Sequence, residues 1–404
     1  MYRIRFVRLL AITVCTAPIV TLAGEDWPQF RGPNRNGMSV ETSLQSSWAP
    51  EGPKEVWRQP LGEGYSAICR VGDRLYTMYA AENDGKAEEM AVALDAATGT
   101  EIWRTPLCER YDTEFGNGPR STPTVVGDKL YVLTARGDLA ALKTEDGSVV
   151  WQFSAPEKLG SSIPGWGYST SPVVDGSTVI VDLGGTESRA TCGIDASSGD
   201  IKWHYDSGRA MYNSLLPIEV DGKQQFVTVY LGKLVGISPQ GEELWQHPWP
   251  QAETHAMPVL IPPNRIFASG VEGAGAAVVE LNGNEPKEIW KSPVMRNHFS
   301  TSIYYADHIF GFDNATLKCI SATDGSLAWA KRGFGKGSMI MANGQIYLLS
   351  DRGALVLFDA TKDGFQQKGK VQALQGRCWT APSLSHGRLY LRNHEEVVCY
   401  DISS

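Results

Sequence analysis

The alternation of apolar runs and turn residues is clearest in one stretch in the first half of the chain. Thr122–Val126, Lys129–Thr134 and Leu139–Leu142 are short runs of β-branched, aromatic and aliphatic residues, and Ser148–Phe153 is a fourth. Turn-forming pairs such as Gly127-Asp128 separate the runs. Short apolar runs bounded by such residues are typical of β-strands joined by tight turns. The stretch therefore predicts a four-stranded antiparallel meander.

This pattern repeats along the chain, and tryptophan marks the period. Seven tryptophans stand 39 to 52 residues apart. Several close the same frame, as in Ala93-Leu-Asp-Ala-Ala-Thr-Gly-Thr-Glu-Ile-Trp103 and Gly193-Ile-Asp-Ala-Ser-Ser-Gly-Asp-Ile-Lys-Trp203. A meander with two apolar faces cannot bury both alone, so copies must pack around an axis. Each tryptophan is expected to pack between adjacent sheets and to bury on the order of 200 Å². The seven are Trp57, Trp103, Trp151, Trp203, Trp245, Trp290 and Trp329.

The two ends of the chain predict how the ring closes. The last unit, Thr380–Asp401, has three strands, whereas Lys54–Trp57 is a fourth strand with no three before it. Joining them would complete one sheet and remove both sheet edges. We therefore expect an all-β fold over residues 53–404: an eight-bladed β-propeller of four-stranded antiparallel blades, closed by an N-terminal strand. Phe365 would replace tryptophan in the eighth outer strand. Seven blades is the alternative, because the units around Trp290 and Phe365 are degenerate.

Two segments precede the predicted propeller. Residues 1–23 begin with a basic region and continue with an apolar run of about 15 residues that ends at Ala23. That run is short for a membrane span of about 20 residues. We expect a cleaved signal peptide without lipidation, and an uncleaved anchor is the alternative. Residues 24–52 form an N-terminal extension, whose Trp27 and Phe30 favour docking onto the propeller.

Charge and cysteine content exclude some classes of function. The net charge is −8, and it becomes −11 when the three arginines of the first eight residues are removed. An acidic protein is a poor general binder of nucleic acid or anionic membrane. Six cysteines remain after cleavage, with no C-x-x-C motif, so zinc-ribbon, haem-attachment and thioredoxin-like sites lack support. The cysteines predict either buried thiols or disulfides.

The repeat frame resembles a known family. Ala93, Asp95, Thr98, Gly99 and Trp103 form A-x-D-x-x-T-G-x-x-x-W, which resembles the tryptophan-docking repeat of pyrroloquinoline-quinone (PQQ) dehydrogenases. The same repeat occurs in the non-enzymatic barrel-assembly lipoprotein BamB. The extension, from Asp-Trp-Pro-Gln-Phe onwards, is also similar to the start of a group of secreted PQQ-like propeller proteins. The resemblance covers residues 53–404 and implies the propeller fold much more strongly than any one activity.

The parts that the dehydrogenases need are missing from the sequence. The resemblance implies a calcium ion held by carboxylate and amide oxygens, an Asp base, and PQQ held between a tryptophan and a vicinal disulfide. No Cys-Cys pair and no haem motif occurs. Gly333–Gly337 has a phosphate-loop composition, but it lies between two β runs and is interpreted as a loop between blades. We expect no catalytic residue, no metal site and no cofactor, with PQQ and calcium as the alternative.

A cluster of hydroxyl and aromatic residues recurs just before the first strand of each predicted blade. Examples are Gly167-Tyr-Ser-Thr170 and His298-Phe-Ser-Thr301. The innermost strands face the axial channel, so these residues would ring one mouth of it. Aromatic, basic and hydroxyl groups that converge are typical of a small-ligand or peptide site. We predict that a ligand contacts Arg120, Tyr168, His255, His298 and Trp379. Alternatively, the hydroxyls satisfy strand ends and the aromatics fill the channel.

The function expected from these features is binding. We predict an exported, non-catalytic scaffold propeller of the cell envelope, periplasmic or secreted. It would recognise a protein or small ligand at the propeller face or channel mouth. It is expected to be a monomer, with no nucleic-acid partner and no membrane insertion after signal cleavage. A quinoprotein-like oxidoreductase is the first alternative. A polysaccharide-related enzyme or binder is the second, and an enzyme of that kind would require two carboxylates about 5–10 Å apart at the mouth.

Overall fold

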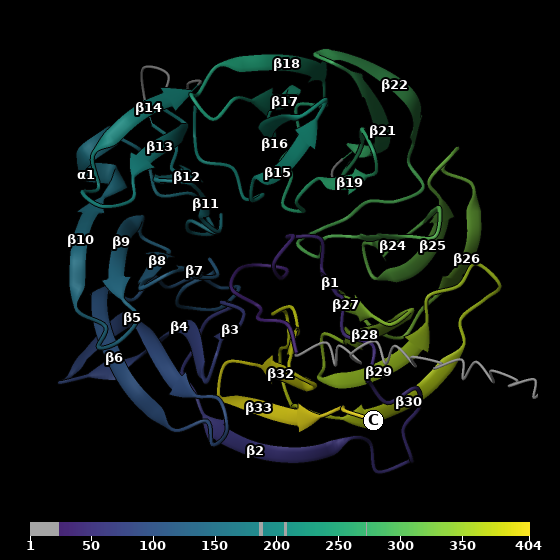
Figure 1. Cartoon of the computed structure of the whole chain (residues 1–404), viewed down its shortest axis with the longest axis horizontal. Coiled ribbons are helices and arrows are strands. Elements are labelled where there is room, and N and C mark those ends of the chain that lie inside the picture. The colour runs from purple at the N-terminus through teal and green to yellow at the C-terminus, as the bar shows by residue number, and fades with distance from the viewer. Residues whose placement is uncertain (1–23, 186–188, 206–207, 272) are drawn as a thin grey trace, which may run out of the picture.

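The described part of the chain is a closed ring of β-sheets. The computed structural model describes residues 24–185, 189–205, 208–271 and 273–404, so the signal peptide predicted for residues 1–23 lies outside it. The described residues form eight antiparallel sheets of four strands around a central axis, and one sheet carries a fifth strand (Figure 1). This confirms the eight-bladed propeller and rules out the seven-bladed alternative.

The first seven blades run from an inner to an outer strand in chain order (Figure 1), whereas the outer strand of the last blade comes from the N-terminal part of the chain. The first four blades are β3 (Cys69–Val71), β4 (Arg74–Asn83), β5 (Lys86–Asp95) and β6 (Glu101–Glu109); β7 (Thr124–Val126), β8 (Lys129–Leu133), β9 (Asp138–Lys143) and β10 (Val149–Ser154); β11 (Val173–Asp175), β12 (Thr178–Asp182), β13 (Thr191–Asp195) and β14 (Ile201–Tyr205); β15 (Leu216–Val220), β16 (Lys223–Tyr230), β17 (Lys233–Ile237) and β18 (Glu243–Pro248). A short helix, α1 (Ala155–Leu159), follows β10.

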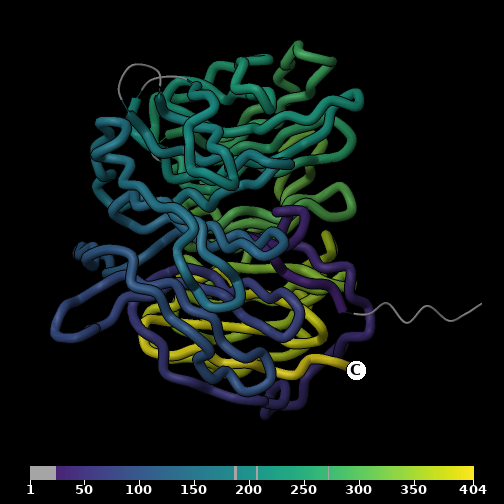
Figure 2. Tube along the Cα trace, turned by 60° about the vertical axis from the view of Figure 1, so that its left-hand side comes forward, coloured from purple at the N-terminus to yellow at the C-terminus, as the bar shows by residue number. Residues whose placement is uncertain are grey.

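The remaining four blades complete the ring. They are β19 (Val259–Ile261), β20 (Arg265–Gly270), β21 (Gly275–Asn282) and β22 (Glu285–Ser292); β23 (Ile303–Tyr305), β24 (His308–Asp313), β25 (Thr316–Ser321) and β26 (Leu327–Lys331); β27 (Ser338–Ala342), β28 (Gln345–Leu349), β29 (Ala354–Asp359) and β30 (Gln367–Gln372); β31 (Ser383–Ser385), β32 (Arg388–Arg392), β33 (Glu396–Asp401) and β2 (Lys54–Pro60). The N-terminal β2 pairs antiparallel with β33, as the chain ends predicted. In Figure 2 these purple and yellow strands lie together at the base of the view.

The turn between the third and fourth strands explains the repeated Asp and Gly. In the first blade, the Asp95 carboxylate accepts hydrogen bonds from the backbone N–H and the hydroxyl of Thr98, at 2.9 and 2.8 Å. Gly99 donates its N–H to the Asp95 carbonyl at 2.8 Å and adopts φ 72°. That left-handed conformation favours glycine. The same turn brings the chain back so that Trp103 pairs with Ala93 across the sheet.

The repeated tryptophans join neighbouring blades, as predicted. The Trp57 indole N–H donates to Ala96 O of the next blade at 3.1 Å, and its ring lies over Gly99 of the same turn. A Cβ on Gly99 would lie 2.5 Å from Trp57, so the indole needs glycine there. The same indole-to-carbonyl bond recurs for Trp103 and Thr144 (3.0 Å), Trp151 and Ala196 (3.2 Å), Trp290 and Ala322 (2.9 Å), and Trp329 and Thr361 (2.8 Å).

The blade formed by β27 to β30 obtains its tryptophan from the N-terminal extension. Our expectation that Phe365 replaces tryptophan in the outer strand is wrong, because Phe365 precedes β30 and its ring lies 6.2 Å from that of Trp329. The register places Gly369 at the tryptophan position, opposite Leu357 and just before the bulge. Trp48 lies over Gly369 and donates its backbone N–H to Lys368 O at 3.0 Å.

The rest of the extension crosses the axial region of the ring (Figure 1). Trp27 is only 1% exposed and exchanges two backbone hydrogen bonds with Arg70, which confirms that this tryptophan docks. Further along, β1 (Met38–Ser39) adds a parallel fifth strand to β27. Arg31 and Arg35 are buried and have left-handed backbones. Their guanidinium groups donate to main-chain carbonyls of Thr301 and Ser302, and of Ser171 and Pro172, which belong to two different blades.

The cysteines of the described chain are free thiols. Cys69, Cys192, Cys319, Cys378 and Cys399 are buried, and Cys108 is half-buried. The propeller is therefore held by packing and hydrogen bonds. Across the described segments, no helix has the length and apolar character needed to cross a membrane.

Candidate ligand-binding site at the channel mouth

A cavity of about 290 Å³ opens at one end of the axial channel. All eight blades line it, each with residues that precede or begin its innermost strand, and the extension contributes two more. The lining consists of Phe30, Arg31, Tyr65, Ala67, Phe115, Arg120, Trp166, Ser169, Ser171, Tyr212, Ser214, His255, His298, Phe299, Ser300, Thr301, Lys336, Ser338, Met339, Trp379 and Ala381. This volume is close to the lower end for small-molecule sites, roughly 300 Å³.

Aromatic rings form a continuous belt around the cavity. Neighbouring ring centroids are 5.0 to 6.1 Å apart along the series Phe115, Trp166, Tyr212, His255, His298, Phe299, Trp379 and Tyr65. The Tyr65 hydroxyl donates to the Phe115 carbonyl and so closes the belt. We call these eight residues the aromatic belt. Offset and edge-to-face ring pairs at such separations are favourable, so the belt holds its shape around the cavity.

The hydroxyl groups of the mouth mostly serve the scaffold. Ser171 Oγ accepts the backbone N–H of Thr122 at 3.0 Å, and Ser214 Oγ accepts that of Ser171 at 2.9 Å. Thr301 Oγ1 accepts the N–H of Met257 at 3.0 Å. Each bond joins the start of one inner strand to the next blade. These hydroxyls therefore satisfy strand ends, whereas the aromatic residues surround a cavity and do not fill the channel.

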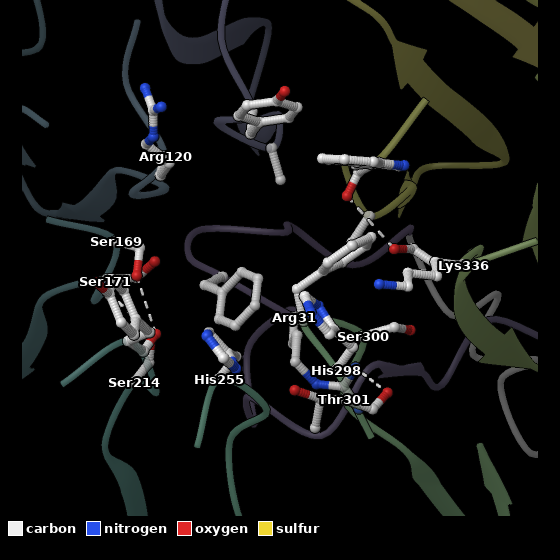
Figure 3. A pocket seen from close by; sticks show the side chains of 18 of the residues that line it. Arg31, Arg120, Ser169, Ser171, Ser214, His255, His298, Ser300, Thr301 and Lys336 are labelled. Carbon is white, nitrogen blue, oxygen red and sulfur yellow. Dashed lines mark hydrogen bonds between the residues drawn. The ribbon is translucent and has the colours of Figure 1, made fainter. Parts of the chain in front are cut away.

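Positive charge gathers at the cavity without ion-pair partners. Arg31, Arg120 and Lys336 line the cavity, and none of the three forms an ion pair within the described residues. Burial lowers the pKa of Arg31 to about 9 and also lowers the pKa of Arg120. Arg120 instead donates to Gly116 O at 2.6 Å and Thr113 Oγ1 at 3.2 Å, and its guanidinium lies over the Tyr65 ring. Lys336 extends its ammonium group toward the middle of the cavity (Figure 3).

Two histidines of the belt are stacked and neutral. The rings of His255 and His298 are 5.0 Å apart and 5° from parallel. Both nitrogens of His255 and Nδ1 of His298 are buried without a hydrogen-bond partner. Burial lowers the pKa of His255 to about 3 and that of His298 to about 4, with Lys336 adding to both shifts. At neutral pH each ring therefore offers one N–H donor and one nitrogen acceptor.

Four of the five residues predicted for the site lie in this cavity. Arg120, His255, His298 and Trp379 line it, although the Arg120 guanidinium points away from its middle (Figure 3). Tyr168 requires a correction, because it does not line the cavity. It is 1% exposed, packs in the core between two blades, and its hydroxyl is 2.7 Å from Ser161 Oγ. Whether a ligand occupies the cavity remains a prediction.

Sequence reasoning missed several lining residues. Trp166 takes the place expected for Tyr168, because Gly167 turns the chain with φ 76° between them. Phe115 could have been found by extending the recurring cluster upstream of Arg120. Lys336 lies in the predicted inter-blade loop Gly333–Gly337, whose position the structure confirms. Phe30 and Arg31 carried no periodic signal because they belong to the extension.

The lining does not fit a calcium-bound quinone. Calcium takes about six to eight oxygen ligands, among them carboxylates. No Asp or Glu lines the cavity, and no group of three or more His, Cys, Asp or Glu among the described residues could hold a metal ion. The same lack of carboxylates leaves no pair for glycoside hydrolysis at this mouth. The nearby Glu89 is buried behind the lining and accepts the backbone N–H groups of Tyr111 and Ala135.

Comparisons with known proteins agree with this architecture. The outer membrane protein assembly factor BamB of Yersinia pestis is 24% identical over 361 residues, which are 85% of this chain and 77% of that protein. The crystal structure of BamB from Moraxella catarrhalis superposes with a TM-score of 0.61 at 16% identity, covering 86% of this chain and 97% of that one. The crystal structure of quinohemoprotein alcohol dehydrogenase from Comamonas testosteroni superposes with a TM-score of 0.65 at 13% identity. The superposition covers 94% of this chain and 81% of that one. The model of the family described as outer membrane protein assembly factor BamB matches residues 87–331. Since this match spans more than half of the sequence, the chain belongs to the BamB family of PQQ-like propellers.

Proposed function

We propose that this chain is an exported propeller of the cell envelope that binds a partner or ligand at the channel mouth and catalyses no reaction itself. The observation that carries the proposal is the mouth cavity. All eight blades and the extension build it, and it presents aromatic and basic groups without a carboxylate. Such a lining can hold a ligand, but it offers no carboxylate as a general acid or base, as a nucleophile or as a metal ligand.

Family membership supports the binding function and the place of action. The curated relative is named as an assembly factor of outer membrane proteins, which is a binding function in the cell envelope. The predicted signal peptide agrees with export to the periplasm or beyond. Once that peptide is removed, the acidic chain would act as a soluble monomer that binds neither nucleic acid nor lipid.

The direct test is photocrosslinking from the mouth in intact cells. A photoreactive phenylalanine analogue replaces Phe115, which is 43% exposed at the mouth. The matched control replaces Val126, which is 45% exposed at the far end of an inner strand. We expect a discrete adduct, detected by mass, from position 115 and none from position 126. Equal labelling at both positions, or none at either, would refute a binding function of the mouth.

The quinoprotein alternative has its own test. The purified mature protein is titrated with PQQ, with and without calcium, and tryptophan fluorescence is recorded. Trp166 and Trp379 belong to the aromatic belt, so a ligand there should quench them. We expect no calcium-dependent quenching and no reduction of an electron-accepting dye with alcohols or sugars. Saturable quenching that requires calcium, together with dye reduction, would establish the dehydrogenase function instead.

A further inference from the structure

The cavity combines three chemical features that together specify a ligand class. Its wall is the aromatic belt, its free charges are positive, and its histidines are neutral with unpartnered nitrogens. We propose that the mouth binds a small aromatic carboxylate, with its ring against the belt and its carboxylate at Lys336 Nζ. This inference rests on the proposed function, because it names the ligand of the same site.

The sign of the ligand charge follows from the charges of the lining. The whole protein is acidic, with a net charge of −8, yet the charged side chains that line this cavity are all basic. Arg31 is almost fully buried and donates only to neutral carbonyl groups, those of Thr301, Ser302 and Asn36. A buried cation without a counter-ion raises the local potential. An aromatic cage alone would also suit an organic cation, but Arg31 and Lys336 would repel one.

Lys336 is the cation that is free to meet a carboxylate. Arg31 and Arg120 use their guanidinium groups on carbonyl and hydroxyl oxygens of the scaffold. Lys336 has no hydrogen bond or ion pair within the described residues, and its ammonium group points into the cavity (Figure 3). It also lies close enough to the two stacked histidines to lower the pKa of both.

The aromatic part of the ligand follows from the shape and polarity of the wall. Most hydroxyls at the mouth already serve inter-blade hydrogen bonds, for example those of Ser171, Ser214 and Thr301. Few remain for a polyhydroxylated ligand such as a sugar, whereas the ring faces of the belt can stack on another ring. The volume of about 290 Å³ suits a ligand of one or two rings.

The experiment compares isosteric probes on the purified mature protein by calorimetry. The probes are 2-naphthoate, the neutral 2-naphthamide, the cationic 2-naphthylmethylammonium and the non-aromatic decahydro-2-naphthoate. We expect 2-naphthoate to bind at least about tenfold more tightly than each of the others, since only this probe combines a charge-assisted hydrogen bond to Lys336 with an aromatic ring that can stack on the belt. Equal binding of the carboxylate and the amide, or no binding of 2-naphthoate, would overturn the proposal.

Substitutions of Lys336 test whether this residue binds the carboxylate of the ligand. Lys336→Gln should weaken 2-naphthoate binding about tenfold or more and leave 2-naphthamide unchanged, and Lys336→Arg should retain most of the affinity. Lys54→Gln, at an exposed lysine on the outer strand β2, is the matched control. Thermal melting checks that each variant is folded. Unchanged 2-naphthoate affinity in Lys336→Gln contradicts the proposal. If 2-naphthoate does not bind but crosslinking from position 115 succeeds, only this inference fails, and the binding function stands.

Discussion

The indole of Trp48 lies over Gly369, where a Cβ would come within 2.6 Å of the Trp48 ring. In the other blades the docking tryptophan belongs to the outer strand itself, as Trp103 does in β6. Here the outer strand carries glycine, and a residue far away in the sequence supplies the indole. The ring centroids of Trp48 and Tyr347 are 6.1 Å apart, which matches the 6.2 Å between Trp103 and Tyr76. The extension therefore completes the blade formed by β27 to β30.

Removing this indole should destabilise the whole ring. Truncating a buried aromatic side chain to alanine costs about 3–5 kcal/mol, and Trp48 is only 9% exposed. We expect Trp48→Ala to lower the free energy of unfolding by about that amount in urea denaturation followed by circular dichroism. Val40→Ala is the control in the same segment, because Val40 is 57% exposed. A loss below about 1 kcal/mol would mean that the extension does not stabilise the blade.

The contact between an indole and the glycine turn can be tested within one blade. Gly99 and Gly85 have similar backbone angles, φ 72° and φ 79°, but only Gly99 faces a tryptophan. Both alanine substitutions incur the left-handed backbone penalty. Gly99→Ala also forces a Cβ against Trp57, and overpacking costs about 1–3 kcal/mol. We expect Gly99→Ala to be the more destabilising by that margin in urea denaturation. Equal losses would show that backbone conformation alone selects the glycine.

The sequence predicted the propeller because its signals are local and repeated. Each blade carries the same turn, as at Asp95 and Gly99, and the turn does not depend on distant contacts. The wrong expectation for Phe365 arose because it relied on the same local repeat. The period places a residue in that frame, but the indole comes from Trp48, whose position depends on how the extension folds back. No local pattern encodes that contact.

The sequence predicted where the site lies, but it predicted only some of the residues that line it. Channel-facing clusters recur with the blade period, which located His255, His298 and Trp379. Which member of a cluster faces the axis depends on the loop path, so Tyr168 was chosen where Trp166 lines the cavity. Lys336 was overlooked because a lysine among glycines in a loop has no distinctive pattern. Its importance appears only when the absence of carboxylates from the lining is known.

The buried histidines should make the protein sensitive to acid. The pKa values of His255, His298 and His394 are lowered to about 3, 4 and 4, mainly by burial, whereas in the unfolded chain each is near 6.5. Between these values the unfolded state binds more protons, so stability falls as pH falls from about 6.5 toward 4. The loss at pH 5 should be on the order of 2 kcal/mol per histidine.

A double variant can assign this sensitivity to the stacked pair. Replacing His255 and His298 with phenylalanine keeps two rings in the belt but removes both titrating groups. Urea midpoints at pH 5 and pH 7.5 should differ much less in this variant than in the natural protein. His308→Asn, at a partly exposed strand position, is the control and should leave the difference unchanged. If the double variant loses as much stability between pH 7.5 and pH 5 as the natural protein does, groups other than this histidine pair cause the acid sensitivity.

The titration of Glu89 should change stability in the opposite direction to that of the histidines, because it favours the folded state at low pH. It is fully buried, and burial raises its pKa to about 7. The folded state therefore holds a proton that the unfolded chain releases near pH 4.5. This contribution to stability is present below pH 4.5 and is lost as pH rises through 7, by about 3 kcal/mol at most. Since its two oxygens accept the N–H groups of Tyr111 and Ala135, Glu89 also anchors the loop that carries Phe115.

Substitution by glutamine isolates this effect. Glu89→Gln keeps the shape of the side chain and removes its titration, so the variant should gain stability relative to the natural protein as pH rises from 5 to 8. Glu88→Gln, at the half-buried neighbour, should show no such trend. The measurement is the free energy of urea unfolding at each pH. Parallel pH profiles for the natural protein and Glu89→Gln would mean that Glu89 is ionised in the fold throughout this range. In that case the backbone N–H groups of Tyr111 and Ala135 would outweigh burial.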